Sequence, residues 1–272
     1  MRCAITVSLV PEVKGGPFVF WDGLEDAFRQ AGGMGFDAVE IFPPGPDGLD
    51  IQLVRREMER SGLAVAAVGT GAGWVVGKMH LCHADESVRV AARAFVRNTI
   101  LKAAEVGAPT ILGSMQGRVE GGVERSQALD WLAEALREFG ELASDCGQTF
   151  LYEPLNRYET NLFNRQGDAA SFLRNRGLSG VSVLADLFHM GIEESDSAAA
   201  LADIADVLGH VHFADSNRQA AGAGQTRFEP VIRQLCSQGY DGYLSAEVFP
   251  LPDPATAAQR TIRRFRELTS NH

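Results

Sequence analysis

Stretches with strand character alternate with stretches of helical periodicity along the whole of this chain. Eight such pairs can be recognised in its 272 residues, which is about 34 residues for each pair. A strand followed by a helix brings the chain back to the start of a neighbouring parallel strand. Eight units favour a closed ring of strands over an open sheet. The sequence therefore predicts one α/β domain, residues 1–272, folded as a single (β/α)8 TIM barrel.

The expected elements can be assigned residue ranges. The predicted strands are Cys3–Leu9, Phe36–Pro43, Leu63–Thr70, Pro109–Ser114, Thr149–Glu153, Val181–Asp186, His210–Ala214 and Tyr243–Phe249. The predicted helices are residues 23–32, 50–61, 86–106, 126–145, 166–176, 197–208, 229–238 and 254–269. The loops after the third and fourth strands are long and rich in glycine. They form either a wall of a substrate pocket or flexible loops without direct contact.

Charge and composition exclude several classes of partner. The formal net charge is −10 and no basic stripe is visible, which disfavours nucleic acid and anionic membranes as partners. No apolar run approaches the roughly 18 residues that a membrane span needs, and the first residues lack the layout of a signal peptide. The four cysteines are scattered at positions 3, 82, 146 and 236. We therefore expect a cytoplasmic protein with reduced thiols.

Four side chains that can bind a metal ion stand at the ends of the fifth to eighth predicted strands. They are Glu153, Asp186, His212 and Glu247, separated by 33, 26 and 35 positions. Spacings close to one strand–helix unit place all four at the same height on neighbouring strands. Three carboxylates and an imidazole that converge on one rim are typical of a site for a hard divalent cation.

Two further residues near this rim, His210 and Glu40, have less support for a role in the metal site. His210 precedes His212 in the same strand, and we expect alternation to send the two rings to opposite sides, so that only one faces the centre. His212 has the better spacing, and His210 is expected to be packed and hydrogen-bonded. Glu40 in the second strand could face the barrel, but no other feature of the sequence gives it a role.

A metal ion between two glutamates suggests a reaction. An ion that chelates two adjacent substrate oxygens acidifies the C–H between them and stabilises the enediolate that forms. One glutamate can remove this proton while the other delivers a proton to the opposite face, which epimerises the carbon beside a ketone. Return of the proton to the neighbouring carbon gives aldose–ketose isomerisation instead.

Four motifs, EPLNRYET, DLFHMGIEE, HFADSNR and AEVF, together resemble the ketose 3-epimerases. This group includes D-tagatose, D-psicose and L-ribulose 3-epimerases within the xylose-isomerase-like barrel superfamily. The resemblance is strongest over residues 150–250. It implies C3 epimerisation of a ketose through a metal-stabilised cis-enediolate, a sugar or sugar derivative as substrate, and a homodimer or homotetramer. It implies that Glu153, Asp186, His212 and Glu247 bind one divalent ion, usually Mn²⁺ and sometimes Co²⁺ or Mg²⁺.

The same resemblance assigns roles to individual residues. Glu153 and Glu247 are the implied acid/base pair, and Glu159, His189 and Arg218 are the implied substrate contacts. For Glu159 and Arg218, ion pairing at the surface is the alternative. The segment AAGAGQTRF departs from the family, which usually has proline and histidine at positions 221 and 225 and an acid where Arg227 stands. These changes leave the identity of the sugar open, and the positive charge of Arg227 suits a phosphorylated or carboxylated substrate.

Other functions share parts of this pattern. A hydroxypyruvate isomerase or another aldose–ketose isomerase of the superfamily would use the same metal ligands. An endonuclease IV-like hydrolase needs a zinc cluster with more histidines and a basic DNA groove, which six histidines and a charge of −10 oppose. A non-catalytic sugar-binding protein would have to keep three converging carboxylates without a cation to neutralise them.

Overall fold

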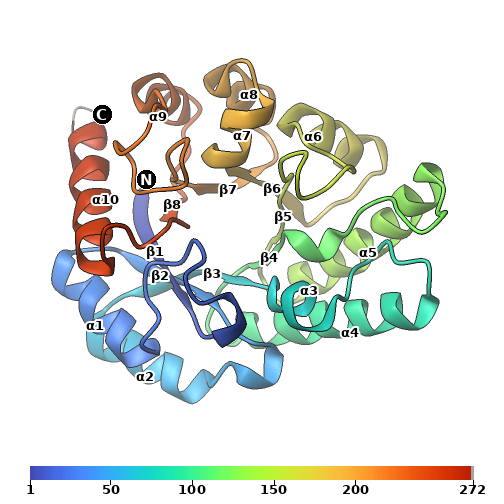
Figure 1. Cartoon of the computed structure of the whole chain (residues 1–272), viewed down its shortest axis with the longest axis horizontal. Coiled ribbons are helices and arrows are strands. Elements are labelled where there is room, and N and C mark those ends of the chain that lie inside the picture. Colours follow the sequence, from blue (N-terminus) through green and yellow to red (C-terminus); the bar gives the residue numbers. More distant parts are fainter. Residues whose placement is uncertain (271–272) are drawn as a thin grey trace.

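The computed structural model describes residues 1–270, in which eight strands close into one barrel (Figure 1). Each strand pairs in parallel with its neighbours in chain order, and β8 pairs with β1. The strands are β1 (Arg2–Ser8), β2 (Ala38–Phe42), β3 (Ala64–Gly69), β4 (Thr110–Leu112), β5 (Phe150–Tyr152), β6 (Val181–Asp186), β7 (Leu208–His212) and β8 (Tyr243–Ala246). The predicted (β/α)8 fold is confirmed.

Helices surround the barrel and return the chain between strands (Figure 1). They are α1 (Leu24–Met34), α2 (Ile51–Ser61), α3 (Ala72–Gly77), α4 (Glu86–Ala104), α5 (Arg125–Asp145), α6 (Gln166–Asn175), α7 (Leu187–Glu193), α8 (Ser197–Asp203), α9 (Phe228–Ser237) and α10 (Pro254–Thr269). Three short 3-10 turns are η1 (Pro11–Val13), η2 (Pro46–Gly48) and η3 (Ser114–Gln116).

Aspartates define where many helices begin. Asp50, Asp85, Asp196 and Asp253 each accept a hydrogen bond from a backbone N–H in the first turn that follows. Such caps satisfy amide groups that the helix itself leaves without partners. Proline at the first position of α10 adds to the same signal.

The sequence placed most elements within a few residues, but one helix end was wrong and two short helices were missed. The predicted helix at 197–208 ends at Asp203, residues 204–207 form a turn, and Leu208 is already the first residue of β7, where it pairs with Val183. The short helices α3 and α7 were not predicted. Both are brief, six and seven residues long, and therefore lack a helical period that a sequence can reveal.

The barrel interior is divided into an apolar and a polar side. Ala67, Ile111, Leu151 and Leu184, from β3 to β6, form a small hydrophobic cluster of their own. Across from them, Glu40 of β2 reaches His210 and His212 of β7 through the interior. The main hydrophobic core is separate and includes the inward faces of the surrounding helices.

The expectation that His210 and His212 face opposite sides is wrong. Residues two positions apart in a strand point to the same side, because the side-chain period is two. Both rings therefore enter the barrel interior, where each bonds one oxygen of Glu40.

The structure bears on two predictions from composition, those about membrane spans and about cysteines. No helix within residues 1–270 is long and apolar enough to cross a membrane. The four cysteines carry free thiols, and Cys3 and Cys82 are buried.

Candidate metal centre and substrate cavity

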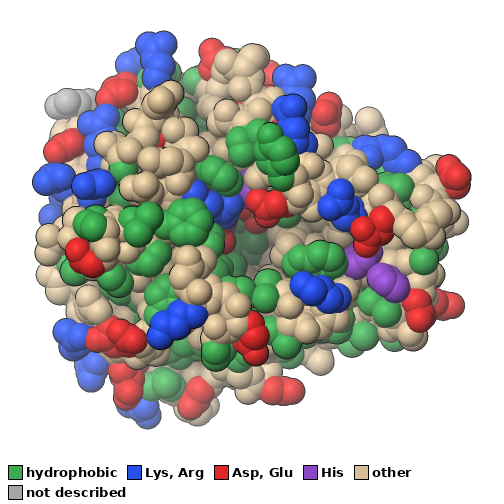
Figure 2. Space-filling model, viewed as in Figure 1, with side chains coloured by type: hydrophobic (Ala, Val, Ile, Leu, Met, Phe, Trp, Pro, Cys, Tyr) green, Lys and Arg blue, Asp and Glu red, His purple; other side chains and the backbone are tan. Residues whose placement is uncertain are grey.

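A cavity of about 820 Å³ opens where the strands end at their carboxyl side. The view down the barrel shows a hollow at the mouth, with acidic and basic side chains meeting along its upper edge (Figure 2). Residues of the loops after β3 and β4 line this cavity, among them Gly71, Val75 and Ser114. Of the two interpretations of these loops, the pocket wall is therefore the one observed.

The four predicted metal ligands meet at the base of this cavity, where Glu153 and Glu247 line it and Asp186 and His212 lie directly beside them. Their ligand atoms all lie within 4.8 Å of one another. His212 Nδ1 lies 3.5 Å from Glu153 Oε1, 3.5 Å from Asp186 Oδ2 and 3.6 Å from Glu247 Oε2. All four side chains are buried. Glu153 and Glu247 each follow their strand by one residue, whereas Asp186 and His212 are the last residues of theirs.

The donor set fits a divalent cation. Glu153 Oε1, Asp186 Oδ2 and His212 Nδ1 are buried and have no hydrogen-bond partner among the described residues. Buried polar atoms are costly to leave unpaired, and three that face one another are accounted for by a shared positive ion. Carboxylate oxygens with one imidazole suit Mn²⁺ and similar ions.

Local structure positions two of these side chains, Asp186 and Glu153. Asp186 Oδ1 caps helix α7 by accepting the backbone N–H of Phe188 at 2.8 Å, which leaves Oδ2 facing the other ligands. Glu153 has room because position 113 is glycine. A Cβ atom there would lie 2.7 Å from Glu153 Oε2.

Burial and neighbouring charges set the proton affinities of the carboxyl groups. Burial raises the pKa of Glu153 to about 7, although His212 partly opposes this shift. Burial also raises the pKa of Glu247. For Asp186 burial acts in the same direction, but His189 and Arg218 outweigh it and the pKa falls below its ordinary range. In the metal-free protein Glu153 can therefore exchange a proton near neutral pH, Glu247 binds its proton more tightly than an ordinary glutamate, and Asp186 binds one less tightly.

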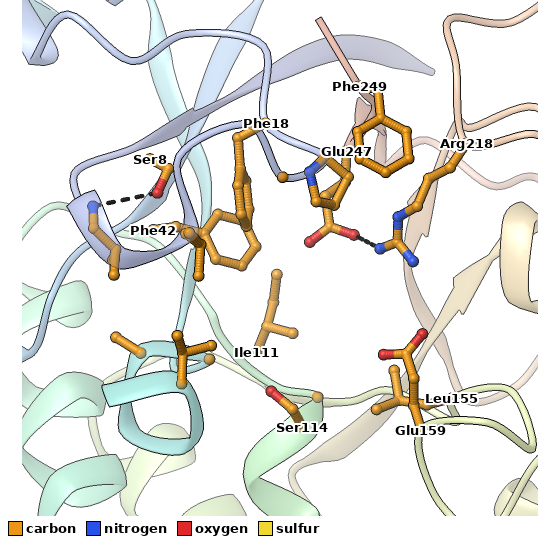
Figure 3. A pocket seen from close by; sticks show the side chains of 18 of the residues that line it. Ser8, Phe18, Phe42, Ile111, Ser114, Leu155, Glu159, Arg218, Glu247 and Phe249 are labelled. Atoms are coloured by element: carbon orange, nitrogen blue, oxygen red, sulfur yellow. Dashed lines mark hydrogen bonds and ion pairs between the residues drawn. The ribbon is translucent and has the colours of Figure 1, made fainter. Parts of the chain in front are cut away.

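Arg218 lies beside the ligands and pairs with two of them. Its guanidinium donates to Glu247 Oε2 and lies 3.5 Å from Asp186 Oδ2, and Figure 3 shows Arg218 and Glu247 facing each other across the cavity edge. Its φ of +56° lies in the left-handed region, which is uncommon for a residue with a Cβ atom. Surface ion pairing, the alternative for Arg218, does not describe this buried contact.

Asp215 holds the loop that carries Arg218. Its carboxylate accepts three backbone N–H groups, from Ser216 at 2.7 Å, Gly222 at 2.8 Å and Thr226 at 2.9 Å. Its own carbonyl accepts the N–H of Arg218 at 2.8 Å. The sequence analysis gave Asp215 no role, although a buried aspartate in a turn rich in glycine and serine is a recognisable loop anchor.

His189 and Glu159 line the cavity on the same side as Arg218, and His189 Nε2 lies 3.5 Å from Arg218 Nη1. His189 Nε2 lies 3.5 Å from Asp186 Oδ2, and its Nδ1 contacts the side-chain nitrogen of Asn156 at 2.7 Å. The same nitrogen of Asn156 donates to Glu159 Oε1 at 2.9 Å. Asn156 therefore links the two predicted substrate contacts, and the sequence analysis missed it.

The residues that depart from the family pattern lie elsewhere. Ala221, Gln225 and Arg227 are not among the residues that line the cavity, and Arg227 is exposed at the start of α9. The hypothesis that Arg227 receives a phosphate or carboxylate of the substrate therefore has no geometric support.

The rest of the cavity wall is mainly apolar, and outside the loops after β3 and β4 it was not predicted. It comes from β2, from β4 and from the segments that follow β1 and β3, and Figure 3 shows Phe18, Phe42 and Ile111 opposite Arg218 and Glu247. Phe18 and Phe42 pack with their ring centroids 4.4 Å apart. The main apolar residues on this side are Val10, Val13, Phe18, Phe42, Ala72, Val75 and Ile111.

Known proteins resemble this chain over nearly its whole length. It is 30% identical to a 3-dehydro-D-guloside 4-epimerase of Escherichia coli K12, covering 91% of this chain and 95% of the relative. It is 28% identical to a ketose 3-epimerase of Arthrobacter globiformis, covering 92% and 86%. These relatives confirm the resemblance to the ketose 3-epimerases and identify the chain as an enzyme of the isomerase class.

Solved structures and a family model agree with this assignment. A 3-keto-D-glucoside 4-epimerase from E. coli, solved in its apo form, superposes with a TM-score of 0.82 at 26% identity, covering 98% of this chain and all of the other. The family model described as xylose isomerase-like TIM barrel matches residues 28–268. The chain therefore belongs to the xylose isomerase-like TIM barrel family.

Proposed function

We propose that this protein is a metal-dependent sugar epimerase that inverts a carbon next to a ketone, with C3 of a ketose as the first candidate. The observation that carries the proposal is the group of unpaired ligand atoms from Glu153, Asp186 and His212 at the cavity floor. A relative named ketose 3-epimerase supports the choice of reaction.

Glu153 and Glu247 are the proposed acid/base pair. They follow β5 and β8, which are separated by two strands, so their carboxylates approach a bound sugar from different directions. One removes the proton beside the ketone, which gives a cis-enediolate, and the other returns a proton to the opposite face. Burial raises the pKa of Glu153 to about 7 in the metal-free protein, and a bound cation would oppose this shift, so that the carboxylate is ionised and able to take a proton.

The remaining charged residues position the substrate. When bound, the divalent ion, for which Mn²⁺ is the first candidate and Co²⁺ or Mg²⁺ the alternatives, supplies positive charge that stabilises developing negative charge on the sugar oxygens. Arg218 and His189 can hydrogen-bond the ketone oxygen from their positions beside Asp186. Glu159 can accept a hydrogen bond from a hydroxyl group farther along the sugar.

The size of the cavity bears on the substrate. Twelve heavy atoms of a ketohexose, each given the roughly 30 Å³ of a liquid water, would fill about 360 Å³. This is less than half of the cavity of about 820 Å³. A keto sugar with an additional substituent, such as a keto-glycoside, is therefore the second candidate substrate, and a relative named guloside 4-epimerase supports it. A three-carbon acid, the substrate expected of a hydroxypyruvate isomerase, would fill still less of the space.

Several finer predictions belong to the same proposal. We propose that residues 1–272 work as one domain, in the cytoplasm, as a homodimer or homotetramer. The state of assembly can be measured by light scattering after size-exclusion chromatography. A strictly monomeric protein with full activity would contradict this part without affecting the chemistry.

The proposal is tested by exchange of the substrate C–H proton into D₂O, followed by NMR. The metal is first removed with a chelator, and Mn²⁺, Co²⁺ or Mg²⁺ is then restored singly. The panel contains free ketoses, 3-keto-glycosides and aldoses. We expect exchange beside the ketone with restored metal and none without it. Full exchange after chelation would overturn the metal-dependent mechanism, and exchange with aldoses alone would favour an aldose–ketose isomerase.

A further inference from the structure

We propose that Glu40 is a positioning residue that orients His212 as a metal ligand. Glu40 accepts the Nε2–H of His212, which leaves the lone pair of Nδ1 directed at the cavity floor. This inference rests on the proposed function, because it assigns His212 to the metal ion described there.

The contact crosses the interior of the barrel. Glu40 lies on β2 and His212 on β7, with β1 and β8 between them. Glu40 Oε1 lies 3.0 Å from His212 Nε2, and both side chains are fully buried. An ionised carboxylate can only accept hydrogen bonds, so the ring nitrogen that faces it must carry the proton. In a neutral ring the other nitrogen, Nδ1, is then free to bind a metal ion.

Glu40 is itself held in place. Its second oxygen, Oε2, lies 2.7 Å from Nε2 of the buried His210, so each oxygen serves one imidazole. A carboxylate fixed by two rings cannot rotate away from His212 without losing a buried hydrogen bond. His210 thus supports Glu40, and Glu40 supports His212.

Irregular strand pairing accompanies both ends of this contact. Between β6 and β7 the register shifts, so that Leu208 and His210 pair with consecutive residues and Gly209 is the extra residue. A Cβ atom at Gly209 would lie 2.6 Å from Ser182 Cβ, so the strand at this point requires glycine. A second shift lies between β2 and β3 beside Glu40. Such bulges change the direction of neighbouring side chains.

A second metal ion is the competing explanation, because Glu40, His210 and His212 also lie close enough to bind one. The two explanations differ in which of these atoms already have hydrogen-bond partners. Both oxygens of Glu40 and the Nε2 atoms of both histidines are already paired with each other. At the cavity floor, by contrast, His212 Nδ1 has no partner in the described part of the chain. The geometry therefore places the metal on Nδ1 and the hydrogen bond on Nε2.

Carboxylates that hydrogen-bond a metal-binding histidine usually strengthen metal binding. A carboxylate that accepts the second N–H of a ligating imidazole fixes its orientation and makes it a stronger donor, and its loss typically weakens metal affinity or activity by about 10–100-fold. We expect an effect of that size for Glu40→Gln, in which a neutral amide replaces the carboxylate at nearly constant volume.

The test compares Mn²⁺ affinity by calorimetry in the wild type, Glu40→Gln, Glu40→Asp and His210→Gln. Glu40→Gln should raise the Kd 10–100-fold, Glu40→Asp should recover part of the loss, and His210→Gln should have a smaller effect than Glu40→Gln. Leu151→Met, a change of similar size on the apolar side of the interior, is the control and should leave the Kd unchanged.

The second readout is the protonation of His212, measured by ¹⁵N NMR with saturating Mg²⁺. The wild type should carry its proton on Nε2, and Glu40→Gln should lose this fixed tautomer. A folded Glu40→Gln protein with the wild-type Kd and the wild-type tautomer would overturn the inference. If Glu40→Gln does not fold, a wild-type Kd in both Glu40→Asp and His210→Gln would do the same.

The two proposals fail in different ways. Tight Mn²⁺ binding that depends on Glu40, together with inactivity on every keto sugar, would leave this inference standing and overturn the proposed function. Epimerisation that persists in full without metal, with a Kd that Glu40→Gln does not change, would overturn both.

Discussion

The two halves of the barrel mouth come from equal numbers of strand–helix units, yet they differ in chemistry. The half after β5 to β8 carries the four buried residues that we propose as metal ligands, and Arg218 and His189 beside them. The half after β1 to β4 offers mainly Val10, Phe18, Phe42, Val75 and Ile111 to the same cavity. The charged half needs defined directions for its hydrogen bonds, whereas apolar burial has no direction.

This difference separates two tasks. The charged half can bind a cation and move a proton, and its side chains are fixed by caps, ion pairs and the contact with Glu40. The apolar half, where Glu12, Lys14 and a few hydroxyl groups are the polar exceptions, can select substrates mainly by size and surface. Changes in the charged half should therefore alter kcat, while changes in the apolar half should alter KM.

The largest effect is expected from Glu247→Gln and Glu153→Gln. Removal of an acid/base group should lower kcat for epimerisation by about 10²–10⁴-fold, because one of the two proton transfers loses its carrier. Both variants should also bind metal more weakly. Glu141→Gln, an exposed position on α5, is the matched control and should behave as the wild type. If kcat stayed unchanged in either site variant, the acid/base assignment would be wrong even with the fold correct.

Phe18→Leu and Phe18→Ala should have a smaller effect, and it should appear in KM rather than in kcat. Loss of apolar contact should raise KM for a keto-glycoside by about 10-fold, with kcat little changed and with a smaller effect for a free ketose. Steady-state kinetics on both substrates measure this split, and the Kd for Mn²⁺ should stay at its wild-type value. A fall in kcat without a change in KM would contradict the division between the halves.

Asp215→Asn should have the smallest effect of these substitutions. It should lower the free energy of unfolding by weakening the loop that carries Arg218. Burial raises the pKa of Asp215, but the backbone N–H groups that it accepts outweigh burial and lower the pKa below its ordinary value. A lowered pKa means that the charged group stabilises the fold above the unfolded pKa of about 3.9 and that this contribution is lost as pH falls below it.

Urea unfolding of the wild type and Asp215→Asn measures this contribution directly. We expect a difference of about 1–3 kcal/mol at pH 7, the usual size for hydrogen bonds to a charged group. The difference should shrink below about pH 4 as the wild-type carboxylate becomes protonated. A difference of the same size at pH 3 and pH 7 would show that the charge of Asp215 does not hold the loop.

The charged half was largely predictable from the sequence. Glu153, Asp186, His212 and Glu247 follow apolar runs at intervals near one strand–helix unit, and strand ends in a parallel barrel share one rim. The order of elements was predictable for the same reason. Helix ends were less so, as the predicted extension of α8 into the start of β7 shows.

The apolar half, and the contact by which Glu40 orients His212, could be found only from the three-dimensional structure. Phe18 and Phe42 lie 24 positions apart in segments without a distinctive pattern, and their pairing depends on how η1 folds over the mouth. Glu40 and His212 lie 172 positions apart and meet through the barrel interior. One signal was available, since the spacing of His210 and His212 by two residues already requires that both rings face the same side.

A crystal structure with Mn²⁺ and a bound keto sugar would test the central claim most directly. We predict a single ion held by Glu153, Asp186, His212 Nδ1 and Glu247, with the carbon beside the ketone between the two glutamates. Any substituent of the sugar should lie against Phe18 and Phe42. An ion bound at Glu40 and His210 instead, or a sugar whose reacting carbon is distant from both glutamates, would contradict this account.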